Sequence, residues 1–537
     1  MSFVVPDSEA WYLPELLARR GEELGGRPFL SFAFDGRELS YGEAADGARS
    51  VAGGLARLRV AEGDRVLLLL RNRAEFALAW LGVAALGAVQ VPVNVDYRGS
   101  FLEHVVETSE AEVLVVEEEL LDAVAASVER LPRLRAVVVV GVPAPLGSRV
   151  EVVAFDQLLQ ASPAPPRPRG DPSAPAAIHF TSGTSGPSKG ALLPHAAAHL
   201  LAERNRELLG LEEDGVYLTE LPLFHVNAQM SVYSALLVGA RVRIERRFSA
   251  SAWLERVRES GATHTSLLGV MLGFLLARPE RPDDGENPLR AAWTVPCPTG
   301  SATAFRERFG LERVVTSYGS TELGMVATRT LGEGPEGSAG RVAEELYEVR
   351  VVDDGDRPLA AGEVGELVVR PRLPWTTMQG YAAAPQATAE AFRNLWFHTG
   401  DAVRVDAAGN LWFVDRFTDR IRRRGENVAS ADVERVLEEH PAIAEAAVVA
   451  VPADEEGGED EIKAVLVAAD GAAIAAETIW AWCDERLPYF AVPRYVELVA
   501  ALPKTPTAKV RKAELRSAGV GPETADRGPA QARRGRR

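Results

Sequence analysis

Residues 180–190, which read F-T-S-G-T-S-G-P-S-K-G, hold three glycines, five hydroxyl side chains and one lysine. Glycine lets backbone N–H groups approach an anion, hydroxyl groups add donors, and lysine adds a mobile positive charge. The P-loop pattern needs glycine before the lysine and Ser or Thr after it, whereas this chain has Ser188 and Gly190. The stretch therefore predicts a polyphosphate-binding loop of another kind, with a flexible surface loop as the alternative for such a composition.

The sequence around this loop predicts an α/β fold. Residues 179–181 have the pattern of a strand end, and the chain from Pro194 onward has a helical pattern. Upstream, helical stretches alternate with β-rich runs, which favours α/β layers around a largely parallel sheet. The runs are V-L-L-L-L (66–70), V-L-V-V (113–116) and A-V-V-V-V (136–140).

At 537 residues the chain is too long for one core. We expect an N-terminal domain over residues 1–415, with two α/β layered subdomains and a small β-barrel-like or sheet subdomain at 340–415. A hinge at 416–418 and a small α+β domain at 419–516 follow. The tail, 517–537, has almost no large apolar side chain and is expected to be disordered.

Composition narrows the class of protein. The net charge of −17 argues against general nucleic-acid binding, which needs a basic footprint. The two cysteines lack ligand-spaced partners, so we expect a reducing, cytoplasmic setting without a disulfide framework or zinc site. No signal peptide is visible, and the apolar stretch 76–93 is interrupted by glycine and proline. We expect that stretch to be a buried helix running into a strand and not a membrane span.

Five further segments carry residues suited to a nucleotide site. Y-G-S-T-E (318–322) joins an aromatic ring to a carboxylate that could bind Mg²⁺. W-F-H-T-G-D (396–401) ends in an aspartate suited to ribose hydroxyls, and residues 415–428 are densely basic. L-P-L-F-H (221–225) pairs an aromatic ring with a histidine, and the segment 503–515 holds an isolated lysine, Lys509. Taken singly, each has an ordinary structural explanation in the core, at a helix cap or on the surface.

Taken together and in this order, the motifs resemble the AMP-forming acyl-CoA ligases of the adenylating superfamily. The crotonobetaine/carnitine-CoA ligase-like group is the most similar, through L-P-L-F-H-V-N-A (221–228), R-F-S-A-S (247–251), D-R-I-R-R-R-G-E-N (419–427) and L-P-K-T-P-T (502–507). The resemblance covers residues 10–516. It implies that ATP, with Mg²⁺, activates a carboxylic acid to an acyl-adenylate, and that the thiol of coenzyme A then displaces AMP.

The resemblance also implies roles for individual residues. The polyphosphate would be held by Thr181, Ser182, Gly183, Thr184, Ser185 and Lys189. Tyr318, with Gly319 and Ser320 beside it, would lie against adenine, Thr321 would touch the α-phosphate, and Glu322 with Thr184 would hold Mg²⁺. Asp401 and Arg416 would bind the ribose. Lys509 would bridge the acid and the α-phosphate and offset charge as the two anions approach.

In the family, a large rotation of the mobile C-terminal domain then removes this lysine. The segment Gly425, Glu426 and Asn427 would replace it and line the tunnel for the pantetheine arm. His225 resembles a gate residue beside the acyl pocket. The expected pocket walls are His225, Asn227, Ala228, Leu268, Gly269, Val270, Met271, Cys297 and Gly319. Because none of them is charged to meet an amino acid, they favour a bulky apolar carboxylate.

The chain departs from the family pattern at three places, and the first two weigh against adenylation. The glycine-rich adenine loop is replaced by Thr294-Val295-Pro296-Cys297-Pro298, in which proline removes a donor and β-branched residues add bulk. Ala508 replaces the glycine before Lys509, at a cost of about 1 kcal/mol if that position needs positive φ. Thr418 stands at the hinge position. One hypothesis is therefore an enzyme that catalyses only the second half-reaction, the thioesterification of an acyl-adenylate made by a sister ligase. The other hypothesis is that the site tolerates these substitutions and both half-reactions are retained.

Two alternative functions and one candidate metal site stay open. The enzyme could load a separate carrier protein, because Arg420 and Arg422–Arg424 suit an acidic partner as well as the phosphates of coenzyme A. It could instead be a non-catalytic protein that binds an acyl-adenylate or a CoA ester. His195 and His199, four residues apart on an expected helix, could share a metal, but no third ligand accompanies them and packing explains both. The oligomeric state is open.

Overall fold

The computed structural model describes residues 11–165, 170–181, 188–295, 297, 299–416, 420–423, 426–453, 459–469, 474–503, 510 and 512–528. Its two compact units are assembled from separate stretches of chain. The larger unit takes in Met1–Val95, Val105–His179 and Gly190–Asp415. The smaller unit takes in Asp96–His104, Phe180–Lys189 and Arg416–Arg537.

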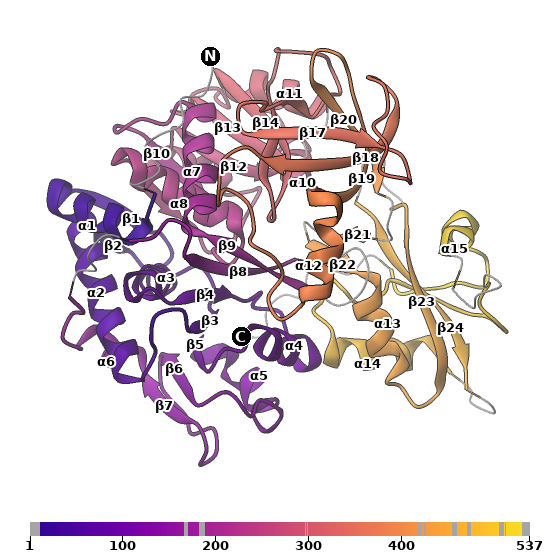
Figure 1. The fold of residues 1–537 in the computed structure, drawn as a ribbon, viewed down its shortest axis with the longest axis horizontal. Coiled ribbons are helices and arrows are strands. Elements are labelled where there is room, and N and C mark those ends of the chain that lie inside the picture. The colour runs from indigo at the N-terminus through magenta and orange to yellow at the C-terminus, as the bar shows by residue number, and fades with distance from the viewer. Residues whose placement is uncertain are drawn as a thin grey trace. The chain divides into compact units, whose positions relative to one another are not determined.

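A seven-stranded sheet has the order β7-β6-β5-β3-β4-β8-β9 (Figure 1). Every pairing from β7 across to β8 is parallel, as the alternation of helices and apolar runs predicts. The strands are β3 (Arg65–Leu69), β4 (Val89–Pro92), β5 (Val113–Glu117), β6 (Ala136–Val140), β7 (Glu151–Ala154), β8 (Pro175–Thr181) and β9 (Lys189–Pro194). Their side chains are almost all buried in β3 to β6, because helices cover a parallel sheet on both faces.

A thirteen-stranded sheet has the order β17-β18-β19-β20-β16-β15-β14-β13-β12-β10-β11-β1-β2. Five pairings in its middle, from β14 across to β1, are parallel. The first strands are β1 (Pro28–Phe32), β2 (Arg37–Ser40), β10 (Val216–Thr219), β11 (Arg241–Ile244), β12 (His264–Leu268), β13 (Ala291–Val295) and β14 (Arg313–Ser320). The later ones are β15 (Gly324–Thr330), β16 (Gly340–Val342), β17 (Tyr347–Val352), β18 (Val364–Pro371), β19 (Phe397–Val405) and β20 (Asn410–Arg416).

The β-rich segment after residue 340 is thus one end of this sheet. Its strands pair mainly antiparallel, and β17 forms an open edge in the strand order of the described residues. The expectation of strands and turns is confirmed, and the sheet is not closed into a barrel.

Helices along the first 391 residues surround these sheets. They are α1 (Leu13–Leu24), α2 (Tyr41–Arg57), α3 (Ala74–Leu86), α4 (Gly99–Ser109), α5 (Leu121–Ala125), α6 (Phe155–Leu159), α7 (His195–Leu209), α8 (Val226–Val238), α9 (Trp253–Ser260), α10 (Gly269–Leu276), α11 (Thr299–Phe309) and α12 (Pro385–Ala391). Single 3₁₀ turns lie at Glu118–Leu120, Val128–Arg130 and Arg393–Leu395. Local chemistry sets such boundaries: Ser40 Oγ accepts the N–H of Glu43 and the Glu43 carboxylate accepts the N–H of Ser40, which begins α2.

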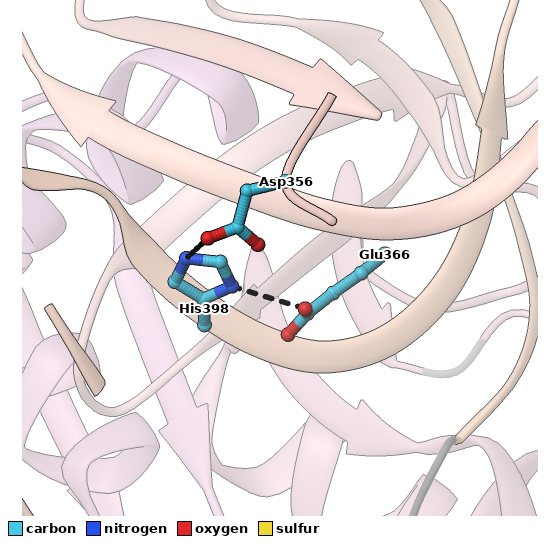
Figure 2. A group of neighbouring side chains, drawn as sticks. All are labelled: Asp356, Glu366 and His398. Atoms are coloured by element: carbon cyan, nitrogen blue, oxygen red, sulfur yellow. Dashed lines mark hydrogen bonds and ion pairs between the residues drawn. The ribbon is translucent and has the colours of Figure 1, made fainter. Parts of the chain in front are cut away.

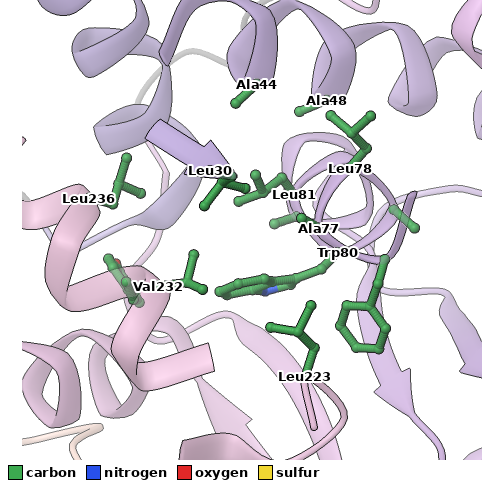
Figure 3. Packing of buried hydrophobic residues seen from close by; sticks show 14 of the residues in the cluster. Leu30, Ala44, Ala48, Ala77, Leu78, Trp80, Leu81, Leu223, Val232 and Leu236 are labelled. Carbon is green, nitrogen blue, oxygen red and sulfur yellow. The ribbon is translucent and has the colours of Figure 1, made fainter. Parts of the chain in front are cut away.

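The stretch 76–93 is a buried helix followed by a strand, as predicted. Helix α3 is apolar on all sides and ends at Gly87, whose φ of 74° suits glycine. Figure 3 shows Trp80 of α3 packed among Leu81, Leu223 and Val232 in the main hydrophobic core. Among the helices that the structure describes, none combines the length and the apolar character needed to cross a membrane.

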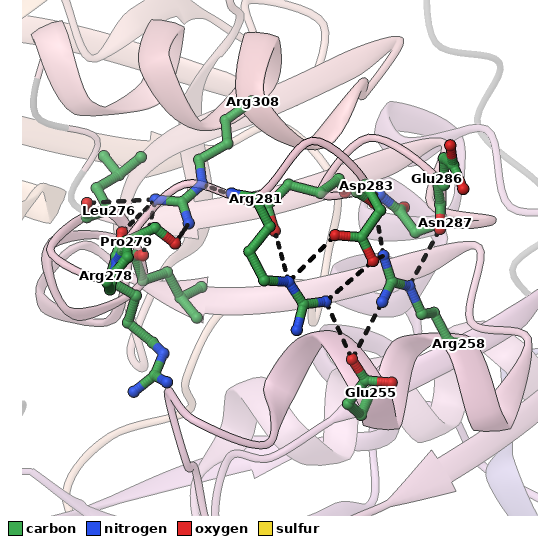
Figure 4. A network of polar contacts seen from close by, with 12 residues as sticks. Glu255, Arg258, Leu276, Arg278, Pro279, Arg281, Asp283, Glu286, Asn287 and Arg308 are labelled. Atoms are coloured by element: carbon green, nitrogen blue, oxygen red, sulfur yellow. Dashed lines mark hydrogen bonds and ion pairs between the residues drawn. The ribbon is translucent and has the colours of Figure 1, made fainter.

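A polar network fixes the connection between α10 and β13 (Figure 4). The Arg308 guanidinium of α11 donates from Nε to Asp284 Oδ2 at 2.7 Å and from its two Nη atoms to the carbonyls of Arg278 and Pro279 at 2.9 Å. Leu275 and Leu276, at the end of α10, also accept from Arg308 at 3.3 Å. One half-buried side chain therefore binds two of the last carbonyls of α10 and two carbonyls of the loop that follows it.

The smaller unit is α+β. Its sheets are β21 (Arg420–Arg423) with β22 (Glu426–Ala429), and β23 (Ile443–Val451), β24 (Glu461–Ala468), β25 (Tyr495–Leu498) and β26 (Ala525–Asp526) in that order. Its helices are α13 (Ser430–Glu438), α14 (Ala476–Arg486) and α15 (Lys512–Ala518). Tyr97 and Phe101 pack against its hydrophobic core.

The expected disorder of the tail is wrong for residues 517–528. Strand β26 pairs antiparallel with β25, and Asp526 receives Arg494 Nε at 2.9 Å. Arg527 donates to both carboxylate oxygens of Asp484, at 2.9 and 2.6 Å. The segment is held by ion pairs and backbone pairing in place of apolar side chains, which is why hydropathy alone missed it. Residues 529–537 lie outside the described part.

Candidate active site

The carboxyl ends of four neighbouring parallel strands place several of the predicted residues at one edge of a sheet. Strands β10, β12, β13 and β14 pair in parallel, so their carboxyl ends share one edge of the sheet. The segment of His225 follows β10, Leu268 ends β12, Cys297 follows β13, and residues 318–320 end β14. In α/β proteins this edge is where ligands bind. Motifs separated by about a hundred residues of sequence thus belong to one region of the larger unit.

Tyr318 and Asp401 form the best-defined pair in this region. The Tyr318 hydroxyl donates to Asp401 Oδ2 at 2.7 Å, although 83 residues separate the two in sequence. Tyr318 is half-buried at the end of β14, and Asp401 is 6% exposed on β19. The aromatic ring expected at adenine and the carboxylate expected at the ribose are therefore physically joined.

Glu322 lies in the turn that connects β14 to β15. It is 9% exposed, and its Oε1 accepts the hydroxyl of Tyr381 at 3.3 Å. Its backbone carbonyl accepts the N–H of Met378 at 2.8 Å. Thr321 beside it is half-buried and Ser320 is exposed. Mg²⁺ in nucleotide enzymes is held by one or two carboxylates together with substrate phosphates, so a single ordered carboxylate among hydroxyls fits this ion.

The glycine at 319 has a structural explanation. A β-bulge between Tyr318 and Gly319 brings the chain so close to the return strand that a Cβ at 319 would lie 1.9 Å from the Gly324 carbonyl oxygen. Glycine is thus required by the backbone of the turn that presents Glu322. This close approach, rather than open space for a substrate, accounts for the residue.

The polyphosphate loop is described only at its two ends. The Thr181 hydroxyl lies 3.5 Å from the Lys189 carbonyl oxygen, so β8 and β9 approach each other where the loop begins and ends. Ser188 is buried, and His104 Nε2 donates to its carbonyl at 2.8 Å. Ser182, Gly183, Thr184 and Ser185 lie outside the described residues, and their roles stay predictions.

The expected acyl-pocket residues divide into two groups. His225 precedes the first turn of α8 and is half-buried, as are Asn227, Leu268 and Met271. Ala228, in contrast, is fully buried in the main core, and Gly269 is buried at the start of α10. Ala228 therefore contributes to packing of α8 and does not present a free wall. The side chain of Val270 lies outside the described part of the chain.

A second histidine, His179, is a neighbour of His225. It is 6% exposed on β8 and hydrogen-bonded to the backbone of Phe224. Burial, together with the neighbouring His225, lowers its pKa to about 3. His179 is therefore neutral near pH 7 and helps to fix the turn that carries His225. Nothing in the motif pattern pointed to it.

The substituted adenine loop is ordered where it is described. Thr294 is fully buried in β13, paired with Leu267 of β12, and the neighbouring Trp293 donates Nε1–H to Ser317 Oγ at 3.2 Å. Burial raises the pKa of the Cys297 thiol to about 11, and the cysteine packs against an apolar cluster, which suits a packed residue and not a nucleophile. Pro296 and Pro298 lie outside the described residues.

The basic segment of the smaller unit differs from expectation. Arg423 is 3% exposed, donates from Nη1 to the Phe490 carbonyl at 3.4 Å and pairs from Nη2 with Glu461 at 2.6 Å. Arg422 lies 3.5 Å from Glu459. The assignment of Arg423 to the phosphates of coenzyme A is wrong, because its guanidinium is buried as a brace of its own unit. A run of arginines in a sequence does not reveal which of them faces inward.

Of the remaining predicted residues of this unit, Glu426 is described with its side chain. Glu426 is half-buried on β22, where Asn427 pairs with Arg422 along the backbone. Arg416 ends β20 and Arg420 begins β21, but their side chains are not described, nor is that of Asn427. Thr418, Arg424, Gly425, Ala508 and Lys509 lie outside the described residues. Their roles remain predictions.

Two groups with metal-like composition have structural explanations. His195 packs on Tyr12 with ring centroids 4.5 Å apart, and His199 bonds the Tyr233 hydroxyl at 3.1 Å, so both serve packing around α7. In the second group His398 Nδ1 lies 3.0 Å from Glu366 and Nε2 lies 3.9 Å from Asp356 (Figure 2).

This second group braces the chain before Asp401. Arg393 Nη2 lies 2.9 Å from Glu366 and 3.4 Å from Asp356, so a guanidinium already balances both carboxylates. The N–H of Gly400 also donates to Glu366 Oε1 at 3.0 Å. These contacts fix the start of β19, the strand that carries Asp401, and they explain the group without a metal.

Comparison with known proteins agrees with this arrangement. Residues 17–382 match the AMP-binding enzyme family and residues 432–509 match the AMP-binding enzyme C-terminal domain. The crotonobetaine/carnitine–CoA ligase of Salmonella paratyphi B is 30% identical over 487 residues, which cover 89% of this chain and 93% of the ligase.

Two solved structures are also similar. A double mutant of o-succinylbenzoate CoA synthetase from Bacillus subtilis, bound to a product analogue, has a TM-score of 0.80 at 26% identity, with 94% of this chain and 98% of that chain covered. The amide bond synthetase of Marinactinospora thermotolerans has a TM-score of 0.79 at 28% identity, with 94% and 99% covered. The Bacillus enzyme has also been seen with its acyl-adenylate intermediate. This chain therefore belongs to the AMP-binding enzyme family, which confirms the adenylate-forming ligase family predicted from its motifs.

Proposed function

We propose that this protein joins a carboxylic acid to coenzyme A through an acyl-adenylate. In the first step a carboxylate oxygen attacks the α-phosphorus of ATP, and the bond to pyrophosphate breaks. In the second step the thiolate sulfur of coenzyme A attacks the acyl carbon, and the bond to AMP breaks. A carboxylate is a poor electrophile, and the adenylate supplies the leaving group that makes the second step feasible.

The observation that carries this proposal is the convergence of Tyr318, Glu322 and Asp401 at the carboxyl end of β14. The Tyr318–Asp401 hydrogen bond places a ring and a carboxylate where a nucleoside offers a flat base and two hydroxyls. Glu322 would hold Mg²⁺, which when bound supplies positive charge beside the triphosphate. Lys189 and Thr181 would contact the phosphates, and Lys509 would meet the attacking carboxylate.

The proposal extends to the chain's division into parts. We place the hinge at residues 416–418, between the AMP-binding domain and a mobile C-terminal domain at 419–516. The acid is proposed to be apolar and bulky, because the half-buried residues Leu268 and Met271 offer apolar surface in the expected pocket.

One test supplies ATP, Mg²⁺ and a panel of aliphatic acids, aromatic acids and amino acids, and measures pyrophosphate release. Release with an apolar acid, followed by thioester formation when coenzyme A is added, is expected. An alternative is that only a synthetic acyl-adenylate reacts, in which case a sister ligase supplies the adenylate. The buried position of Thr294 favours the complete reaction, since this side chain of the substituted loop packs inside the sheet.

The acceptor is tested in the same assay. Coenzyme A is the expected acceptor, and a holo carrier protein in equal concentration serves as the competing substrate. Preferred transfer to the carrier would overturn the acceptor part of the proposal. Binding of the adenylate without turnover under every combination would overturn the catalytic part.

A further inference from the structure

Tyr381 lies next to the carboxylate that the proposed function assigns to Mg²⁺. Its hydroxyl donates to Glu322 Oε1 at 3.3 Å across 59 residues of sequence, and the tyrosine is half-buried. The same stretch of chain holds the backbone of Glu322, because the Met378 N–H donates to the Glu322 carbonyl at 2.8 Å. Glu322 is thus held at its side chain and its main chain by residues 378–381.

This stretch is itself fixed to β9, the strand that begins at Lys189. Leu192 N donates to the Gly380 carbonyl at 2.9 Å, Gln379 N donates to the Leu192 carbonyl at 2.9 Å, and Ala382 N donates to the Gly190 carbonyl at 2.8 Å. Ala191 and Tyr381 form an antiparallel bridge. The tyrosine therefore lies at an isolated antiparallel bridge beside β9, within a segment that backbone hydrogen bonds fix on both sides of it.

Helix α12 holds the other side of this stretch. The Tyr381 N–H donates to Thr388 Oγ1 at 2.8 Å. The Thr388 hydroxyl in turn donates to the Ala384 carbonyl at 3.0 Å. Gly380 has a φ of +148°, and a Cβ there would lie 2.8 Å from Thr388 Cγ2. The backbone of Tyr381 is consequently defined by hydrogen bonds on both sides, which limits where its hydroxyl can lie.

We propose that Tyr381 is a positioning residue that orients the Glu322 carboxylate for Mg²⁺·ATP. A carboxylate on a turn can adopt several rotamers, and the tyrosine hydroxyl favours the one that points at its partner. Because the segment of Tyr381 is hydrogen-bonded to β9, the tyrosine ties this rotamer to the strand that follows the polyphosphate loop. The inference rests on the proposed function of Glu322 and deepens it.

The test compares Tyr381→Phe with a matched control, Tyr347→Phe. Tyr347 is buried, and its hydroxyl donates to the carbonyl of Leu323, the residue after Glu322, at 2.6 Å. Both variants thus remove one tyrosine hydroxyl from the same turn, but only Tyr381 touches the carboxylate. Any general loosening of the turn will appear in both.

The main readout is binding, which needs no knowledge of the acid. Mn²⁺ in the presence of α,β-methylene-ATP is titrated into the full-length protein and followed by electron paramagnetic resonance. We expect Tyr381→Phe to weaken Mn²⁺ binding about tenfold. Loss of a group that orients a metal ligand typically weakens metal binding by about 10- to 100-fold, and this expectation takes the lower value. Tyr347→Phe should bind Mn²⁺ as the unaltered protein does.

A second readout separates the two half-reactions with the best acid of the panel. Tyr381→Phe should raise the Mg²⁺ concentration needed for half-maximal pyrophosphate release, while thioester formation from the synthetic adenylate stays within twofold. Unchanged metal binding, or equal loss in both half-reactions, would overturn the proposal. If Tyr381→Phe is unstable, Thr388→Val replaces it in the test. Thr388→Val removes the acceptor of the Tyr381 N–H but keeps the Tyr381 hydroxyl, so it should raise the required Mg²⁺ concentration by a smaller factor.

A Glu322→Gln variant distinguishes the positioning role of Tyr381 from the assignment of Glu322 to Mg²⁺, on which that role rests. Loss of Mn²⁺ binding in Glu322→Gln with none in Tyr381→Phe would contradict only the positioning role. Normal Mn²⁺ binding in Glu322→Gln would contradict the assignment of Glu322 itself, and with it the proposed role of Tyr381.

Discussion

The hydrogen bond between Tyr318 and Asp401 makes a specific prediction for ATP affinity. Tyr318→Phe keeps the ring but removes the donor to a carboxylate that is 6% exposed. Hydrogen bonds to charged groups contribute about 1.5–3 kcal/mol, so we expect KM for ATP to rise about tenfold or more, with kcat changed much less. Steady-state kinetics checks this, and an unchanged KM would show that the pair does not position the nucleotide. Tyr41→Phe, which removes a buried hydroxyl bonded to the Ala240 carbonyl, is the control.

For single residues, the sequence predicts those that stand in a recognisable motif better than those whose role depends on a partner distant in sequence. Tyr318, Glu322 and Asp401 were predicted because each stands in a short, chemically distinctive segment. Tyr381 and His179 were missed because their partners lie far away in sequence, at Glu322 and Phe224. Arg423 was assigned wrongly because a basic run looks exposed until packing shows which guanidinium faces the Phe490 and Val492 carbonyls.

Among the secondary-structure elements, the connection held by Arg308 offers a stability test. Its guanidinium meets Asp284 and four carbonyls between α10 and β13 (Figure 4). Arg308→Lys keeps the charge but cannot supply that planar set of donors, so several acceptors, Asp284 among them, lose their partners. We expect the free energy of unfolding to fall by about 2–3 kcal/mol.

Urea denaturation followed by tryptophan fluorescence measures this change. The exposed neighbour gives the control: Arg278→Lys should stay within about 0.5 kcal/mol of the unaltered protein. Equal stability of the two variants would mean that water replaces the Arg308 contacts without loss.

Element type was largely predictable because hydrophobic period and strand composition are local properties. The apolar runs at 66–70, 113–116 and 136–140 are buried parallel strands, and 76–93 is a helix followed by a strand. Pairing between strands was less predictable, since it depends on partners distant in sequence. The β-rich segment after 340 joins the sheet of β10 to β14, and β26 completes the sheet of the smaller unit through ion pairs.

For the molecule as a whole, the buried groups His199 and Glu220 are expected to change the free energy of unfolding in opposite directions as the pH falls. Burial lowers the pKa of His199 to about 3, so below pH 6.5 the unfolded chain binds a proton that the folded chain does not. Its contribution to stability is complete above pH 6.5 and is lost as the pH falls towards 3. Burial raises the pKa of Glu220 to about 7, so its contribution is complete below pH 4.5 and is lost as the pH rises through 7.

Two substitutions separate these contributions. His199→Asn should reduce the loss of stability between pH 7.5 and pH 5 by about 2 kcal/mol, because the proton uptake on unfolding disappears. Glu220→Gln should act in the opposite sense, leaving a protein whose stability declines less as the pH rises from 5 to 7.5. Urea unfolding at both pH values measures each change, and parallel shifts at the two values would contradict the protonation states inferred for these groups.

The most direct measurement on the complete reaction follows an oxygen atom. The best carboxylic acid of the panel is labelled with ¹⁸O in both carboxylate positions and incubated with ATP, Mg²⁺ and coenzyme A. If the carboxylate attacks the α-phosphorus and sulfur then breaks the bond to AMP, the AMP keeps one acid oxygen and its mass rises by about two units. Unlabelled AMP, or ADP in its place, would contradict an acyl-adenylate intermediate.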